Sequence, residues 1–214
     1  MAGEQVHIPI NGASLDGELV VPQGAEGLVV FVHGSGSSRL SPRNNYVAQG
    51  LQEAGLATFL FDLLTSAEDQ VYANRFDIPL LTQRLLLVHQ WLAGKEETRS
   101  LHLGLFGAST GAAAALRAAA ELGEDVGAVV SRGGRPDLTG ADVLPKVKAP
   151  TLLLVGGLDH GVIELNQQAF ERLDGEKHLE IIPGATHLFE EEGKLEEVAR
   201  QATEWFRTHL SGPG

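Results

Sequence analysis

The sequence predicts an α/β fold in which helices cover both faces of a mostly parallel β-sheet. Three observations support this. Short runs of residues are apolar throughout, which is typical of strands buried on both faces inside a parallel sheet. Between these runs lie segments with apolar residues at helical spacing. The two patterns alternate along the chain, so we expect right-handed helical crossovers between successive parallel strands.

The first two apolar runs differ from the later ones. Residues 5–10 and 15–21 are separated by Asn11-Gly12, a dipeptide typical of tight turns. We therefore expect an antiparallel hairpin at one edge of the sheet.

The remaining elements follow in alternation. Apolar runs predict strands over 28–32, 57–61, 101–106, 126–130, 151–155 and 179–182. Helical spacing, or a run of alanines, predicts helices over 44–54, 78–92, 110–122, 163–173 and 194–210. No repeat or linker divides the chain, so residues 1–214 are expected to form a single domain.

Length and charge exclude several classes of protein. A chain of 214 residues buries roughly 70% of its unfolded surface on folding. The net charge of −12 argues against a nucleic-acid binder or a polybasic membrane anchor. The absence of Cys excludes a disulfide scaffold, thiolate catalysis and Cys-ligated metal sites. No signal peptide and no apolar run of about 18 residues is seen, so we expect a soluble, cytoplasmic protein.

The most informative motif is the pattern G-x-S-x-G at residues 107–111, between a predicted strand and a predicted helix. A serine on such a sharp turn projects its hydroxyl above the sheet, and small neighbours avoid collision with adjacent backbone. The N-terminus of the following helix stabilises negative charge on an attacked carbonyl oxygen. Ser109 is therefore the candidate nucleophile. A glycine-rich turn with a solvent-facing serine is the alternative.

In this motif the chain resembles the α/β-hydrolase superfamily, and more narrowly its small members similar to dienelactone hydrolase. The resemblance implies an eight-stranded α/β-hydrolase sheet, with the catalytic acid after the seventh strand and the catalytic histidine after the eighth. Asp159 and His187 stand at these positions, in Gly156-Gly157-Leu158-Asp159 and Pro183-Gly184-Ala185-Thr186-His187. Dienelactone hydrolases proper use a Cys nucleophile, which this chain lacks, so the resemblance points to a serine esterase.

The resemblance also implies an oxyanion hole. The superfamily builds half of it after a core strand, where this chain has Phe31-Val32-His33-Gly34-Ser35-Gly36-Ser37-Ser38. The expected donors are the backbone N–H groups of Thr110 and Ser35. A phosphate-binding loop is the rival interpretation, and it fails because Arg39 stands where the third glycine of G-x-G-x-x-G is needed.

Other residues compete for these roles. His160 neighbours Asp159, but adjacent loop side chains usually point apart. Asp62 is the alternative acid, with a structural role favoured, and His33 is expected to shape its loop. A turn role for Asp159 and a solvated surface position for His187 remain open. The eight histidines show no metal-binding spacing, so neither a metal nor another cofactor is expected.

The loops suggest the class of substrate. Residues 131–150 are too few for an independent lid, and Tyr72 and Phe76 in the 63–77 loop are candidates to line the site. A small, short-acyl ester is therefore expected. One or two of the loop arginines could hold a substrate carboxylate, Arg132 and Arg39 among them, although pairing with local Asp or Glu is the alternative. The arginines in question are Arg39, Arg43, Arg75, Arg132 and Arg135.

The motifs leave three functions open. The first is a serine carboxylesterase that forms an acyl-enzyme on a Ser-His-Asp triad. The second is an acyltransferase or perhydrolase, in which an alcohol or a peroxide replaces water. The third is a hydrolase-like domain that only binds ligands or proteins. The expected partner is a small ester, with no nucleic acid or membrane, and the sequence does not determine the oligomeric state.

Overall fold

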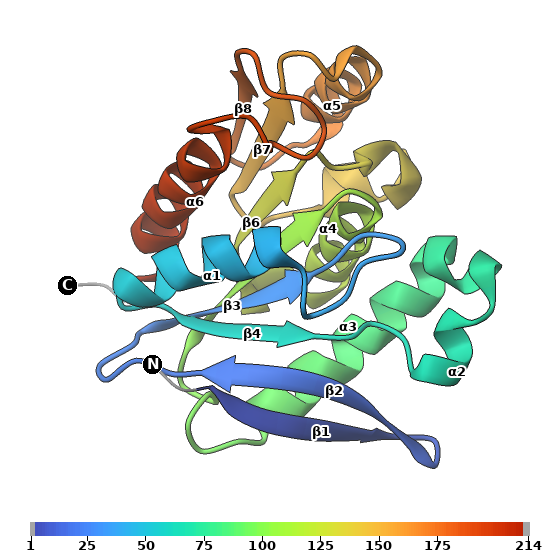
Figure 1. Cartoon of the computed structure of the whole chain (residues 1–214), viewed down its shortest axis with the longest axis vertical. Coiled ribbons are helices and arrows are strands. Elements are labelled where there is room, and N and C mark those ends of the chain that lie inside the picture. Colours follow the sequence, from blue (N-terminus) through green and yellow to red (C-terminus); the bar gives the residue numbers. More distant parts are fainter. Residues whose placement is uncertain (1–2, 212–214) are drawn as a thin grey trace.

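The computed structural model describes residues 3–211, so the outermost ends of the predicted 1–214 domain, residues 1–2 and 212–214, lie outside the described residues. Eight strands form one sheet in the order β1-β2-β4-β3-β5-β6-β7-β8 (Figure 1). The strands from β4 to β8 in that order pair in parallel, whereas β1 and β2 are antiparallel. The strands are β1 (Glu4–Ile10), β2 (Ala13–Val20), β3 (Gly27–Val32), β4 (Ala57–Phe61), β5 (His102–Ala108), β6 (Val126–Arg132), β7 (Thr151–Gly156) and β8 (Lys177–Ile182).

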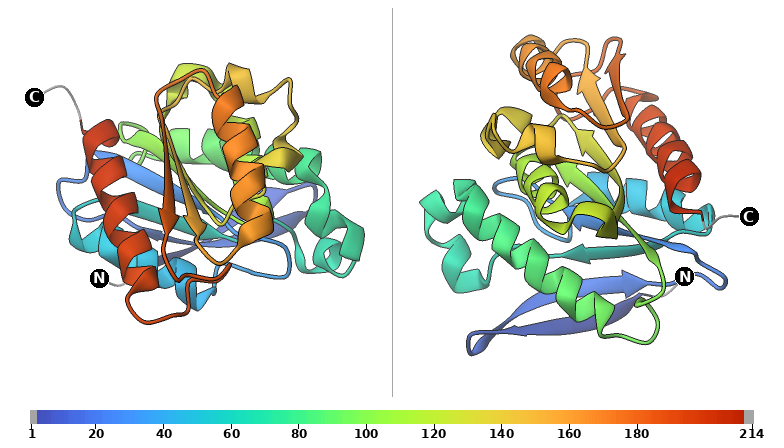
Figure 2. Two further views of the ribbon diagram at one scale, coloured as in Figure 1. Left: turned by 90° about the horizontal axis from the view of Figure 1, so that it is seen from above. Right: turned by 180° about the vertical axis from the view of Figure 1, so that it is seen from behind.

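Helices cover both faces of this sheet. Two helices, α1 and α6, lie on one face, and α3, α4 and α5 lie on the other (Figures 1 and 2). Within residues 3–211, no helix combines the length and the apolar character that a bilayer span requires. The helices are α1 (Pro42–Glu53), α2 (Ser66–Asp69), α3 (Ile78–Ala93), α4 (Thr110–Leu122), α5 (His160–Arg172) and α6 (Lys194–Leu210).

The strand alternation builds two cores. Val29 of β3 points to the α1/α6 face, and its neighbour Val30 points to the face covered by α3, α4 and α5. Both side chains are almost completely buried. The central strands are therefore apolar on both faces, which is why they appear in the sequence as unbroken apolar runs.

The predicted eight-stranded α/β architecture without a large cap is confirmed. The N-terminal hairpin turns at Asn11 and Gly12, which both have positive φ, at 42° and 81°. Two positive φ values are the geometry that this turn needs to match the twist of the strands.

The 63–77 segment is more ordered than the loop that the sequence predicts. It contains α2 and a 3₁₀ helix, Tyr72–Phe76. Thr65 caps α2, and the carboxylate of Glu68 accepts hydrogen bonds from Thr65 and from Arg84 of α3. The segment is thus tied to α3, through a pairing between residues that are far apart in the sequence.

The parallel strands place their carboxyl ends at one edge of the sheet. The segments that follow β3, β4, β5, β6, β7 and β8 therefore emerge on the same side of the molecule. Ligand and catalytic sites of open α/β sheets lie at this edge. The predicted site residues all belong to segments that begin there.

Candidate active site

Ser109 forms the turn between β5 and α4. Its φ is 51° and its ψ is −124°, a conformation that residues other than glycine rarely adopt. The segment after β6 holds this strained turn from both sides. The Ser109 N–H donates to the Arg132 carbonyl at 3.2 Å, and the Ser109 carbonyl accepts from the Arg135 N–H at 3.0 Å.

Three glycines make room for this turn. A Cβ at Gly111 would lie 2.1 Å from the carbonyl oxygen of Val32, and one at Gly107 would lie 2.4 Å from Cα of Ala112. A Cβ at Gly34 would lie 3.0 Å from Cβ of Ser109. The first two contacts are with backbone, which cannot move aside without displacing β3 or α4.

Asp159 and His187 meet although 28 residues separate them. His187 Nδ1 lies 2.6 Å from Asp159 Oδ2, and the Asp159 side chain is only 17% exposed. Asp159 occupies the N-cap position of α5 but makes no side-chain capping bond. The carboxylate is therefore directed to the imidazole, which is the partner that a catalytic acid requires.

The His187 ring also packs against the segment after β6. Gly133 has a φ of 52°, and a Cβ there would lie 3.5 Å from Cε1 of the His187 ring. Gly133 directly follows Arg132, whose carbonyl accepts from the Ser109 N–H. Ser109 and His187 thus flank the same two residues at the end of β6.

The loop that carries His187 depends on two residues that sequence reasoning missed. Phe189 is completely buried against the α1/α6 core and has a φ of 56°. Glu191 accepts hydrogen bonds from the N–H and the hydroxyl of Thr186, at 3.1 and 2.5 Å. Glu191 belongs to the acidic run 190–192, which directly follows this loop in the sequence. No sequence pattern indicates the contact between Glu191 and Thr186. For Phe189, an isolated aromatic residue beside acidic residues is a weak indication of burial.

His33 holds the loop after β3 to the end of β4. Its Nδ1 lies 2.9 Å from the Gly34 carbonyl and must donate to it, and its Nε2 accepts from the Leu63 N–H at 3.0 Å. Burial lowers the pKa of His33, only partly offset by its bond to Gly34 and by the nearby Asp62. The imidazole is thus neutral with both nitrogens occupied, as a structural role requires.

The Ser35 N–H already has an acceptor in this structure. It donates to Thr110 Oγ1 at 2.9 Å, and Thr110 is almost completely buried. The sequence places these two residues together correctly, but it did not indicate that the Thr110 side chain would fill the position beside the predicted donor. A carbonyl oxygen that uses the Ser35 N–H must replace this hydroxyl.

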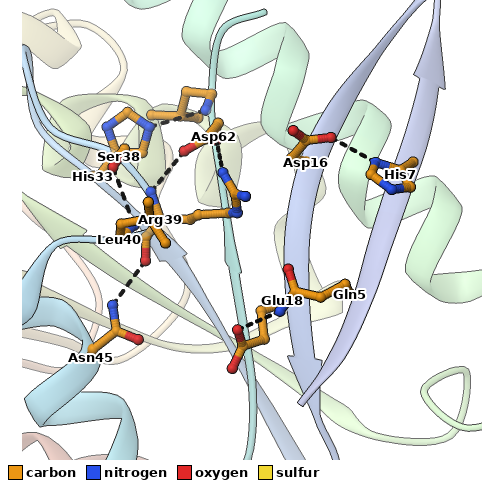
Figure 3. A network of polar contacts seen from close by, with 11 residues as sticks. Gln5, His7, Asp16, Glu18, His33, Ser38, Arg39, Leu40, Asn45 and Asp62 are labelled. Carbon is orange, nitrogen blue, oxygen red and sulfur yellow. Dashed lines mark hydrogen bonds and ion pairs between the residues drawn. The ribbon is translucent and has the colours of Figure 1, made fainter.

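Arg39 pairs with a carboxylate of the same chain. Its backbone N–H and its guanidinium both donate to the carboxylate of Asp62, at 2.7 and 2.5 Å (Figure 3). This is the pairing with a local carboxylate that the sequence left as the alternative, and the role of Arg39 in substrate binding stays a prediction. This pair also gives Asp62 the structural role that the sequence favoured.

Tyr72 and Phe76 form an exposed aromatic pair. Their ring centroids lie 5.2 Å apart, and their exposed fractions are 71% and 44%. Their predicted role in lining the substrate site stays a prediction. Within residues 3–211, no group of three or more His, Asp or Glu side chains is arranged to hold a metal ion.

A sequence model of the dienelactone hydrolase family matches residues 15–210. The chain belongs to the dienelactone hydrolase family. The crystal structure of a dienelactone hydrolase from Anabaena variabilis is 54% identical, covers 98% of each chain and superposes with a TM-score of 0.94. Est1E from Butyrivibrio proteoclasticus shares the fold at 18% identity, with a TM-score of 0.82 over 97% of this chain and 99% of its own. Membership of this family supports hydrolase activity.

Relatives in two strains of Mycobacterium tuberculosis carry a different name, "Putative phosphoribosyl transferase". Each is 57% identical over 211 residues. The match covers 99% of this chain but 47% of each relative, so the chain spans about half the length of these curated proteins.

Replacing Gly111 tests the close approach that shapes the turn. Gly111→Ala should lower the free energy of unfolding by at least about 2 kcal/mol, because its Cβ overlaps the Val32 carbonyl oxygen. Gly161→Ala is the matched control, since a Cβ there has nothing within 4 Å and Ala favours a helix. Urea denaturation measures both variants. Equal losses of stability in the two variants would show that the approach of α4 to β3 is not constrained.

His33 should make stability depend on pH. The folded state keeps His33 neutral, whereas the unfolded chain binds a proton below about pH 6.5. The free energy of unfolding therefore falls as the pH drops below that value, and the fall should be smaller in His33→Asn. Urea denaturation at pH 7.5 and 5.5 measures the difference, with exposed His102→Asn as the control. An equal fall in wild type and His33→Asn would contradict the assignment.

Proposed function

We propose that the protein is a serine hydrolase that cleaves small carboxylic esters through an acyl-enzyme. The observation that carries this proposal is the bond of 2.6 Å between His187 and Asp159, at the sheet edge where Ser109 is held in a strained turn. The alternatives without catalysis, namely a solvent-facing turn serine, a turn role for Asp159 and a surface position for His187, do not account for this arrangement. A surface histidine needs no partly buried carboxylate as its partner, and a turn serine needs no positive φ.

In the proposed reaction, Ser109 Oγ attacks the carbonyl carbon of the ester and His187 accepts the proton of the hydroxyl. Asp159 fixes the tautomer of His187 and stabilises the imidazolium that forms. The protonated His187 then gives its proton to the leaving alcohol, and the acyl group stays on Ser109. A water molecule, deprotonated by His187, attacks this acyl-enzyme and releases the acid.

The negative charge of the tetrahedral intermediate needs backbone donors. The N-terminus of α4 lies at Thr110, so its N–H and the helix dipole favour an oxyanion there. The Ser35 N–H is the second donor, once the substrate oxygen replaces Thr110 Oγ1. If the Thr110 side chain rotates away, the substrate oxygen takes the place of Thr110 Oγ1 as the acceptor. The Ser35 N–H therefore has a hydrogen-bond partner in both the free and the occupied site.

The names of the relatives fit this proposal in different ways. The dienelactone hydrolase name is consistent with ester or lactone cleavage, but the nucleophile proposed here is a serine. Phosphoribosyl transfer is named for proteins of which this chain matches about half. That activity is not proposed for this chain.

Removing the Ser109 hydroxyl tests the proposal directly. Ser109→Ala should lower turnover of p-nitrophenyl acetate by about three orders of magnitude or more, with the melting temperature retained. Ser131→Ala is the control, because the buried Ser131 hydroxyl has no hydrogen-bond partner within residues 3–211. It should retain turnover. The wild type, but not Ser109→Ala, should be labelled by a fluorophosphonate. Undiminished turnover in Ser109→Ala would refute the proposal.

The preferred acyl length follows from the missing cap. Residues 133–150 contain only two short 3₁₀ helices, Pro136–Thr139 and Leu144–Lys146, and no lid-like insertion. We expect kcat/KM for p-nitrophenyl esters to decline as the acyl chain lengthens from acetyl to decanoyl, since little apolar surface is offered to a long chain. Equal values for butyryl and decanoyl esters would contradict this expectation.

A further inference from the structure

Asn166 is a buried polar residue that the proposed reaction does not use. It lies in α5, and none of its surface is exposed. Its side-chain Nδ2 donates to the Gly134 carbonyl at 3.0 Å and to the Val162 carbonyl at 2.8 Å. Because two carbonyl oxygens face the same atom of the amide, that atom is the nitrogen and not the oxygen. Asn166 therefore joins α5 to the segment after β6.

The other end of this amide has no partner. Among residues 3–211, no hydrogen bond reaches the buried Oδ1 of Asn166. A buried polar atom without a partner destabilises the folded state, so the face of α5 gains nothing from this oxygen. The donor to Gly134 is what an apolar side chain of the same size would lack. This bond is therefore the feature of Asn166 that requires an explanation.

Gly133 and Gly134, called the glycine pair below, lie between two contacts of the catalytic residues. A Cβ at Gly133 would lie 3.5 Å from Cε1 of the His187 ring. Directly after the pair, the Arg135 N–H donates to the Ser109 carbonyl at 3.0 Å. Glycine has more backbone freedom than any other residue, so the position of two adjacent glycines depends on the bonds made to them.

Packing explains why Gly134 is a glycine. A Cβ there would lie 2.0 Å from Oγ of Ser131 and 2.7 Å from Cβ of Ala112, in the first turn of α4. The site has no space for a side chain that would restrict the backbone. The bond from Asn166 to the Gly134 carbonyl supplies that restriction from outside.

The helix that carries Asn166 also carries Asp159. Asp159 occupies the N-cap position of α5, and its carbonyl accepts from two N–H groups of the first turn, at 3.0 Å each. Asn166 follows it by seven positions, about two helical turns, so both side chains leave α5 on about the same side. One helix thus holds the carboxylate that bonds to His187 and the amide that bonds to Gly134.

These contacts form a closed path. Asp159 connects α5 to His187, and the His187 ring packs on Gly133. Gly134 follows in the chain, and Asn166 connects it back to α5. In a closed path each contact limits the movement of the others, so loss of the Asn166 bond frees the glycine pair to move relative to His187.

The nucleophile is tied to the same glycine pair. The main chain of Ser109 bonds to residue 132 before the pair and to residue 135 after it. We propose that Asn166 is a positioning residue for the reaction, which holds the glycine pair so that His187 stays within reach of the Ser109 hydroxyl. Asn166 is fully buried and acts through the main chain. This inference rests on the function proposed above.

Labelling by an excess of a fluorophosphonate tests this role. The final extent of labelling counts the competent molecules, and the rate constant reports the attack by Ser109 with the help of His187. Asn166→Leu, which is similar in size but has no donor, should lower this rate constant about 10- to 100-fold, because the nucleophile and the base are misplaced. For p-nitrophenyl acetate, kcat should fall while KM stays within about threefold, because no contact to the substrate is removed.

Thr98→Val is the matched control. The Thr98 hydroxyl is buried and donates to the Leu92 carbonyl at 2.5 Å, so valine also removes a buried hydrogen bond to a main-chain carbonyl at nearly constant size. Thr98 precedes β5 and thus lies near the opposite end of that strand from Ser109. This variant should have a lower melting temperature than the wild type, but it should be labelled at the wild-type rate.

A second variant covers the case in which leucine does not fit. Asn166→Ala removes the same donor with a smaller side chain that favours a helix, and it should also be labelled slowly. The inference is overturned if the folded Asn166 variants are labelled at the wild-type rate, whatever the extent, or if Thr98→Val is slowed as much as they are. Failure of the proposed function is seen separately, as turnover that survives in Ser109→Ala. If only the inference fails, turnover still depends on Ser109.

Discussion

The structure depends on one close approach of backbone to backbone. The start of α4 lies so near the end of β3 that a Cβ at Gly111 would come within 2.1 Å of the Val32 carbonyl oxygen. This approach forces the chain to reverse direction at Ser109, with φ at 51°. Strain of this kind persists only where the surroundings over-determine it. Here two backbone hydrogen bonds from the segment after β6 supply the restraint.

The end of β6, together with the segment that follows it, organises the rest of the site. This stretch holds the main chain of Ser109 through Arg132 and Arg135 and contacts the His187 ring at Gly133. His187 is fixed from the other side by a buried Phe189 and by the bond to Asp159. The end of β6 is therefore the part of the sheet that fixes the nucleophile and the base relative to each other.

The distribution of charge leaves the buried Arg132 without a carboxylate partner among residues 3–211. The chain has a net charge of −12, so carboxylates are plentiful, and the neighbouring loop arginines are each paired with one. Leaving one guanidinium buried and unpaired costs stability. Such a cost is ordinarily found where function requires it.

The sequence by itself determined the order and type of the strands and of the five longer helices, because burial on both faces makes each central strand an unbroken apolar run. It also determined Ser109 as a candidate, because a sharp strand-to-helix turn needs small residues around the serine, whereas Asp159 and His187 followed from the resemblance to the α/β-hydrolase superfamily. Tertiary structure decided the partners. Arg39 meets Asp62, Thr110 covers the Ser35 N–H, Phe189 anchors the His187 loop, and Arg132 is left without a carboxylate. A side chain's partner depends on which segments the fold brings together, and local pattern contains no information about distances between residues far apart in the chain.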